Sequence, residues 1–416
     1  MSVKFRIKIL SCLVVVGLVV TACSTTKASN NVSSSKESTS SVLLPSPTTI
    51  AMPTIPPYTV TTLLNITFSN NEDGFGLFLD ERYSGINYAC TLSVGQTING
   101  GFSFANFHKI PLEGCSANFI DIDNQGVGIL YDTGLAITDN NGASWTVTKF
   151  KNVISALVSG TTIWILTGRC NSFNYQTLKC YMVYSTDGGI TWSSNIELPN
   201  EGTSTGVYQI AVDTSNSIYL LEQNPTVLSA MLFESSNNGE SWQLLSSPEC
   251  LGGPPKPVES LSLAQDSSLW LACASMGGSG NQLKSVAESS DGGKTWTDCA
   301  ATPTPNVFQY TGPWCSSMGT LGYLGGIFGI SSTTAVVYGG RNTIWFTHNS
   351  GVSFEPVQSP TQMVSIMQSE GGSGGADFIN ADDGWVIASP GGTSSLWYTT
   401  DGGITWTKRY SCSCQS

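Results

Sequence analysis

The chain has 416 residues and a formal charge of −12, because 29 Asp and Glu outnumber 17 Lys and Arg. This balance argues against a basic surface for nucleic acid. Charged residues make up 11% and aromatic residues 10% of the chain, which also has 44 Gly; this composition excludes coiled coils and most helical bundles. The 40% hydrophobic content suffices for two or three average domains or for one large all-β domain.

The first 22 residues are predicted to be an export signal. Three basic residues precede an apolar run from Ile9 to Val20, which is short for a membrane-spanning helix. The next residues, Val20-Thr21-Ala22-Cys23, resemble the lipobox of bacterial lipoproteins, in which the Cys becomes the lipidated first residue. The resemblance implies a lipid anchor on Cys23. An ordinary cleaved signal or a retained helix is the alternative.

Residues 23–57 are predicted to form a tether. After Cys23 the segment is rich in Ser, Thr and Pro, so it cannot bury enough apolar area to order itself. As a flexible coil it reaches about 30 Å on average. The body, residues 58–416, is therefore expected to lie outside the cytoplasm, held at a distance from the membrane surface by the tether.

Ten cysteines follow the anchor, and an even number in an exported chain favours disulfides. Proximity suggests that Cys90 pairs with Cys115, Cys170 with Cys180, Cys250 with Cys273 and Cys299 with Cys315, leaving Cys412 and Cys414 unassigned. A metal site is the alternative interpretation of these cysteines. The chain has no CxxC pair and only two histidines, His108 and His348, so we expect no metal and no cofactor.

One eight-residue pattern, Ser/Thr-x-Asp/Asn-x-Gly-x-Ser/Thr-Trp/Phe, recurs every 41 to 58 residues. The seven copies are TINGGFSF (97–104), TDNNGASW (138–145), STDGGITW (185–192), SSNNGESW (235–242), SSDGGKTW (289–296), THNSGVSF (347–354) and TTDGGITW (399–406).

The residue types predict a structural turn. The third residue should accept hydrogen bonds from the amides of its own turn and tolerate a left-handed conformation, the Gly should supply a positive φ, and the aromatic residue should begin the next strand and pack inward. The third residues are Asn99, Asn140, Asp187, Asn237, Asp291, Asn349 and Asp401. We therefore expect these turns to support the fold and not to form an active site.

Short alternating strands precede each turn, and the second strand of most repeats opens with an aromatic residue. The residues at this position are Phe75, Val127, Trp164, Tyr219, Trp270, Ala335 and Trp385. With the strand before it and the one after the turn, each repeat has four strands, which is typical of a β-propeller blade. The sequence thus predicts an all-β fold, a single seven-bladed propeller of four-stranded antiparallel blades. The ring is expected to close either by side-by-side packing of the first and last blades or by addition of residues 58–62 as a strand.

The eight-residue turn resembles the Asp-box, or BNR repeat, of sialidases, sortilin-type receptors, xyloglucan hydrolases and photosystem II assembly factors. The DGGxTW copies, with Asp383-Gly384-Trp385-Val386 upstream of the last, are most similar to the assembly factors and their bacterial relatives. This resemblance implies help in building or stabilising a membrane complex. Function transfers poorly across a fold, however.

A sialidase would need an Arg trio and a Phe-Arg-Ile-Pro-like motif ahead of its first Asp-box. Outside the export signal the chain has four Arg, namely Arg82, Arg169, Arg341 and Arg409, and the motif is missing. A glycosidase that uses a pair of carboxylates remains open, since separated acids leave no sequence signature. A carbohydrate-active enzyme is therefore the alternative function.

Three of these Arg are predicted to lie in loops between second and third strands, on the face opposite the Asp-box turns. Arg82, with Tyr83 beside it, Arg169 and Arg341 would then form an anion-recognition cluster. Alternatively, each Arg pairs with a nearby acid such as Asp80 or Glu81, or lies solvated. Tyr175, Tyr310 and Trp314 fall in long inserts near the same face, where they would either bind a partner or cover blade edges.

These observations favour a membrane-anchored binding or assembly module that recognises a protein or an anionic partner through one face. A glycan is the alternative ligand. Carboxylates converging on the face of Arg82 and Arg169 would favour the enzyme, whereas exposed Tyr and Trp would favour protein binding.

Overall fold

The computed structural model describes most of the residues from Tyr58 onwards. They are residues 58–84, 87–112, 119–122, 126–131, 134–168, 180–199, 207–213, 215–224, 229–246, 258–274, 278–298, 315, 318–319, 322–339, 343–356, 373–388 and 394–412. The predicted export signal, Cys23 and the tether lie outside them.

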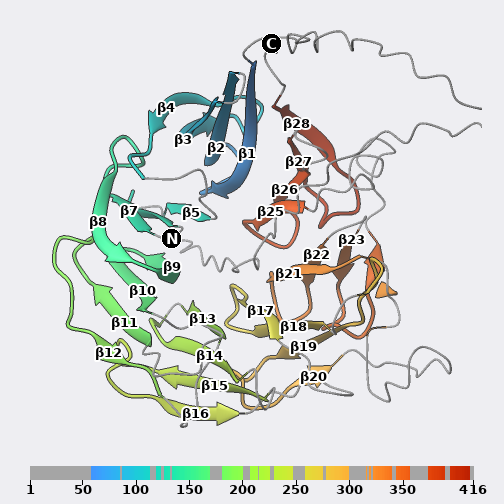
Figure 1. Ribbon diagram of the computed structural model, residues 1–416. Coiled ribbons are helices and arrows are strands. Elements are labelled where there is room, and N and C mark those ends of the chain that lie inside the picture. Colours follow the sequence, from blue (N-terminus) through green and yellow to red (C-terminus); the bar gives the residue numbers. More distant parts are fainter. Residues whose placement is uncertain are drawn as a thin grey trace, which may run out of the picture.

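The described strands form seven four-stranded antiparallel sheets arranged in a ring (Figure 1). Blades one to four are β1 (Tyr58–Phe68), β2 (Asp73–Ser84), β3 (Asn87–Ile98), β4 (Ala105–Lys109); β5 (Phe119–Ile122), β6 (Gly128–Tyr131), β7 (Gly134–Thr138), β8 (Thr146–Lys151); β9 (Val153–Ser159), β10 (Thr162–Gly168), β11 (Cys180–Ser185), β12 (Ile196–Glu197); β13 (Val207–Val212), β14 (Ile218–Asn224), β15 (Ser229–Ser235), β16 (Gln243–Ser246).

Blades five to seven follow the same order, and this confirms the predicted seven-bladed fold. They are β17 (Val258–Leu263), β18 (Leu269–Ala274), β19 (Lys284–Ser289), β20 (Thr297–Asp298); β21 (Leu324–Gly329), β22 (Ala335–Gly339), β23 (Thr343–Thr347), β24 (Glu355–Pro356); β25 (Ser373–Phe378), β26 (Gly384–Ala388), β27 (Ser395–Thr399), β28 (Thr407–Ser411).

The core lies between neighbouring blades. Each second strand is covered on both faces by the adjacent blades, so every residue of β18 and β26 is buried, whereas the outer strand β8 is mostly exposed. The predicted aromatic residues of the second strands are among the largest fully buried side chains, as Trp164, Trp270 and Trp385 show. Burial on both faces explains why these strands read as continuous apolar runs.

All seven Asp-box turns share one hydrogen-bond network. The hydroxyl of the first residue donates to the third residue's Oδ1 at 2.7–3.0 Å. The same hydroxyl accepts from the Gly amide at 2.8–3.0 Å, and the seventh amide donates to Oδ1 at 2.8–3.1 Å. The third residue therefore accepts the amide hydrogen bond expected of it.

The left-handed backbone occurs at the fourth and fifth positions, not at the third as predicted. In the third box these are Gly188 (φ 72°) and Gly189 (φ 89°). The side chain of Asp187, the third residue, reaches forward to the amide of Thr191, the seventh, and the two left-handed glycines lie between them. A Cβ on Gly189 would also lie within 2.3 Å of the Ile137 side chain in the preceding blade, so Gly permits close packing of the blades.

The closing aromatic residues pack inward, but they precede the fourth strand instead of beginning it. Trp145, Phe354 and Trp406 are buried, and the other four are half-buried. In two boxes the indole Nε1 donates to the carbonyl of the box Gly, at 2.9 Å. The aromatic ring thus closes the turn over the blade interface.

Polar side chains of the innermost strands join adjacent blades. Ser260 and Ser262 of β17 accept hydrogen bonds from the amides of Ile327 and Gly329 in β21, each at 2.9 Å. Likewise, Gln209 of blade four accepts a hydrogen bond from the Leu261 amide of blade five, and Asp377 of blade seven accepts one from the Phe68 amide of blade one. An edge strand would otherwise present unpaired amides, so these side chains complete the inner edges of the sheets.

The ring closes by side-by-side packing of blades one and seven, and residues 58–62 belong to β1 of the first blade. A continuous stack crosses the seam, and we call it the closure stack. Phe68 lies on Trp385 with ring centroids 3.7 Å apart, and Trp385 lies on Tyr398 at 4.6 Å. The Arg409 guanidinium lies 4.4 Å from the Tyr398 ring and 4.1 Å from the Phe102 ring. The stack thus begins and ends in blade one.

Four of the predicted disulfide cysteines are disulfide-bonded: Cys90, Cys180, Cys273 and Cys315. Their predicted partners Cys115, Cys170, Cys250 and Cys299 lie outside the described residues, as does Cys414. Cys412 instead carries a free, buried thiol, which corrects its inclusion among the disulfide candidates. Its amide donates to the Ser394 carbonyl, so backbone pairing at the end of β28 holds Cys412 inside the seam between blades seven and one.

Candidate functional site

The two faces of the ring differ in what they carry. In an antiparallel blade the hairpin between the second and third strands and the turn between the third and fourth lie at opposite ends. The Asp-box turns lie beside the loops between first and second strands, as the hydrogen bond from the Gly188 amide to the Thr161 carbonyl shows. We call this side the Asp-box face and the opposite side the hairpin face.

Arg82 and Tyr83 lie on the hairpin face, but within β2 and not in a loop as predicted. The reason is the length of the first hairpin, whose strands β2 and β3 have 12 residues each. The other predicted binding residues, Arg169, Tyr175, Tyr310, Trp314 and Arg341, lie outside the described residues. Their assembly into a cluster with Arg82 stays a prediction.

The end of this hairpin is organised around Glu81. The hydroxyls of Tyr83 and Tyr88 both donate to Glu81 Oε1, at 3.1 and 2.9 Å, and their ring centroids lie 5.3 Å apart. Partial burial, together with the hydrogen bond to Glu81, raises the pKa of Tyr88 to about 12. The Tyr88 phenol is therefore held as a neutral donor, and Tyr88 remains about half exposed (49%).

Arg82 lies on the other side of the strand and is exposed. Its neighbour Asp80 accepts a hydrogen bond from Thr61 Oγ1 at 2.7 Å, and Glu81 is engaged by the two tyrosines. Among the described residues Arg82 forms no ion pair with either acid. Because Asp80 and Glu81 are consecutive in a strand, their side chains point to opposite faces and do not converge as a carboxylate pair.

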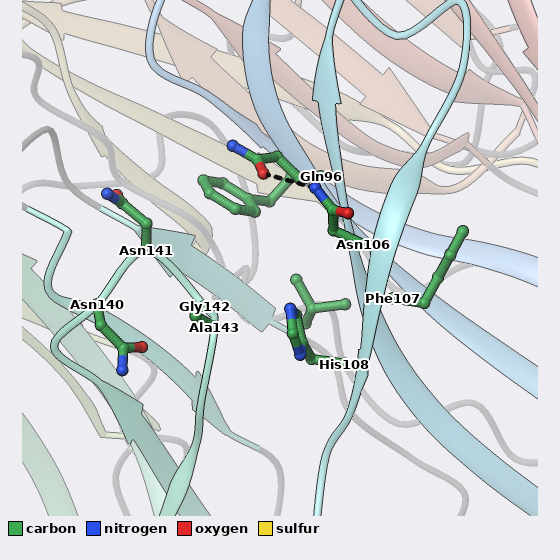
Figure 2. Close-up of a pocket in the computed structure, with 10 residues that line it drawn as sticks. Gln96, Asn106, Phe107, His108, Asn140, Asn141, Gly142 and Ala143 are labelled. Carbon is green, nitrogen blue, oxygen red and sulfur yellow. Dashed lines mark hydrogen bonds between the residues drawn. The ribbon is translucent and has the colours of Figure 1, made fainter.

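The structure also has a groove that the sequence analysis did not identify. It lies on the Asp-box face between β4 of blade one and the second Asp-box, and it has a volume of about 320 Å³. Figure 2 shows Asn106 and His108 on the side of β4 that faces this turn, with Gln96 hydrogen-bonded to Asn106. A second hollow shares His108 and extends past Lys109 to Trp145.

Backbone irregularity creates this groove. The pairing of β3 with β4 shifts between Val94 and Gln96, and Asn106 takes a left-handed conformation (φ 52°), so β4 departs from the blade. Asn140 belongs to the groove as well as to its Asp-box, where its amide bonds to Ser144 at 2.8 Å. No local motif marks the groove, because its walls come from two different repeats.

Metal-binding chemistry is not evident in the described part of the chain. There, no three His, Cys, Asp or Glu side chains gather as a metal site would require. The same residues contain no helix long and apolar enough to cross a membrane.

Comparisons with known proteins agree with this architecture. The BNR/Asp-box repeat model matches residues 183–194 and 397–408, whereas no curated protein matches the chain in sequence.

Solved structures share the fold at low sequence identity. YCF48 bound to a D1 peptide is 14% identical, with 84% of this chain and 99% of that chain covered and a TM-score of 0.51. YCF48 from Cyanidioschyzon merolae is 16% identical over 72% and 86% of the two chains, with a TM-score of 0.46. The GH74 enzyme of Niastella koreensis is 13% identical over 83% and 58%, with a TM-score of 0.42. The chain is therefore a seven-bladed β-propeller with BNR/Asp-box repeats, and its fold is similar to that of YCF48.

Proposed function

We propose that the protein is a membrane-tethered binding module that holds a protein partner on its hairpin face. The observation that carries the proposal is the end of the first hairpin, where the Tyr83–Tyr88 pair fixed by Glu81 lies on one side of the strand and an exposed Arg82 on the other. Tyr and Arg are the residues that most often dominate binding energy at protein interfaces.

Rigidity of this site supports the same function. Glu81 holds both phenols in place, and Cys90, its register partner in β3, is disulfide-bonded. A partner would therefore meet an ordered surface, which lowers the entropic cost of association. The similar propeller YCF48 has been found with a D1 peptide bound, which is consistent with a propeller face that takes up a protein segment.

Affinity capture tests the proposal. The full chain, solubilised from membranes, is compared with the double variant Arg82→Gln, Tyr88→Ser and with Lys149→Gln, which removes one exposed charge from the outer strand β8. We expect the double variant to retain about a tenth or less of the captured partner, because it loses two hot-spot side chains. The control should retain all of it. Equal capture by the double variant would contradict binding at this hairpin.

A further inference from the structure

The sixth position of each Asp-box lies at the tip of its turn, on the Asp-box face. The residues there are Phe102, Ala143, Ile190, Glu240, Lys294, Val352 and Ile404, and all seven are exposed. The larger apolar ones are exposed to 52–80%. Since Glu and Lys occupy this position in blades four and five, the turn itself does not require an apolar side chain.

The apolar tips fall in five consecutive blades of the ring. Val352, Ile404, Phe102, Ala143 and Ile190 belong to blades six, seven, one, two and three, which follow one another across the closure (Figure 1). We call these five residues the apolar arc. Neighbouring blades approach each other here: a Cβ on Gly402 would lie 3.3 Å from the His348 ring, and Arg409 of β28 stacks on Phe102.

Single apolar residues on a surface are ordinary, but here the same turn position is exposed and apolar in five consecutive blades on one face, which points to an interaction site. The groove between blades one and two opens within this arc, and Ala143 lines it. The arc therefore combines exposed apolar tips with a recess that has amide side chains on its walls.

The charges around the apolar arc favour one class of partner over others. Glu72, Asp73, Asp139 and Asp382 are exposed carboxylates in the turns and loops of blades one, two and seven. The described part of these turns and loops has no Lys or Arg; in the adjoining strand β28, Arg409 is engaged in the closure stack and Lys408 is exposed. An acidic surround favours a basic partner and disfavours anionic lipid.

We propose that the apolar arc docks a second protein partner, whose contact surface combines apolar side chains with Lys or Arg. This inference goes beyond the proposed function, because it concerns the opposite face. A protein that binds one partner on each face would bring the two together.

Selection from a random peptide library displayed on phage tests the inference, with the full chain in detergent as the bait. We expect the selected peptides to be basic and to contain apolar residues. The triple variant Ile190→Ser, Val352→Ser, Ile404→Ser should bind them at least about tenfold more weakly, because it removes three exposed anchors. Added salt should weaken binding by the parent chain.

A matched control uses the same turn position outside the arc. The variant Glu240→Ser, Lys294→Ser should bind the peptides as the parent does, and so should Arg82→Gln, Tyr88→Ser, which separates this inference from the proposed function. Because all these side chains are exposed, unchanged thermal unfolding confirms that each variant is folded.

Three results would overturn the inference. The first is a selection that yields only acidic peptides, or none. The second is equal binding of the peptides by the triple variant. The third is arc-dependent sedimentation of the chain with vesicles of phosphatidylcholine or of phosphatidylcholine with phosphatidylglycerol, which would assign the arc to a membrane surface.

Discussion

At the scale of single residues, Glu288 is a buried group whose charge the fold opposes. It lies in β19, 5% exposed, opposite Trp270 in the strand register. Burial, with added repulsion from Asp266 and Asp291, raises its pKa from 4.5 to about 7. Within the described part of the chain its Oε1 accepts no hydrogen bond. Ionised Glu288 is therefore a cost to the folded state.

The sign of the pH dependence follows from the raised pKa. Well below pH 4.5 Glu288 is protonated in both states, whereas between its unfolded and folded pKa values the unfolded chain ionises first and the folded state loses stability. We expect Glu288→Gln to stabilise the protein near pH 8 by about 1 kcal/mol once solvent screening is allowed for, and to change little near pH 4.

Urea unfolding at the two pH values measures this difference. Glu234→Gln is the matched control, because Glu234 occupies the same position of blade four and is only half-buried. A stability difference between Glu288→Gln and the parent that does not grow with pH would show that Glu288 is not the group responsible.

At the scale of elements, the closure stack substitutes for a shared strand. Each blade is made of four consecutive strands, so no strand of the last repeat completes the sheet of the first. Cohesion at the seam comes from the closure stack and from hydrogen bonds such as that from Trp385 Nε1 to the Gly100 carbonyl at 3.0 Å. Arg409 links the two blades directly, because its guanidinium lies between the ring of Tyr398 in blade seven and the ring of Phe102 in blade one.

We expect Arg409→Gln to lower the free energy of unfolding by about 1–2 kcal/mol, because two cation–π contacts are lost. Urea unfolding measures the change. Lys408→Gln, at an exposed neighbouring position of β28, removes the same charge without touching a ring and should change stability little. If both variants unfold at the same urea concentration as the parent, the guanidinium does not hold the seam.

At the scale of the whole molecule, the first strand decides the face at which the chain enters the propeller. Tyr58, the first residue of β1, is the register partner of Tyr83, so the chain enters the propeller at the hairpin face. A lipidated Cys23 with the tether of residues 23–57, about 30 Å in mean reach, would place this face toward the membrane. The Asp-box face would then point away from it, open to a second partner.

The anchor itself is testable with Cys23→Ser. The residue is the lipid acceptor that the lipobox resemblance implies, and several acyl chains bind a membrane far more strongly than one. We expect the variant to move from the membrane fraction to the soluble fraction, by about tenfold or more, as measured by fractionation and immunoblotting. Retention of Cys23→Ser in membranes would locate the anchor elsewhere, and Cys12→Ser serves as the control within the predicted signal.

Local chemistry made the architecture predictable. Seven copies of one turn, each with its acceptor at the third position and its Gly at the fifth, follow from hydrogen bonds within eight residues, and they stand out in the sequence for that reason. The count of blades, the four strands of each and the division into two faces follow from these repeats. The burial of Trp164, Trp270 and Trp385 could also be predicted, because the second strand of a blade is covered on both faces.

Contacts between repeats could not be predicted in this way. The groove beside Asn106, the stack through Arg409 and the burial of Glu288 depend on how segments far apart in the chain are placed. The grouping of Tyr83 and Tyr88 around Glu81 lies within one hairpin and depends on the register of β2 with β3. The left-handed fourth position of the turn was missed because Asn, Ser and Gly all occupy it. Hydrogen bonds within a turn involve residues close together in the sequence, so the sequence pattern predicts them. Packing between blades involves residues far apart in the chain and is decided only by the tertiary structure.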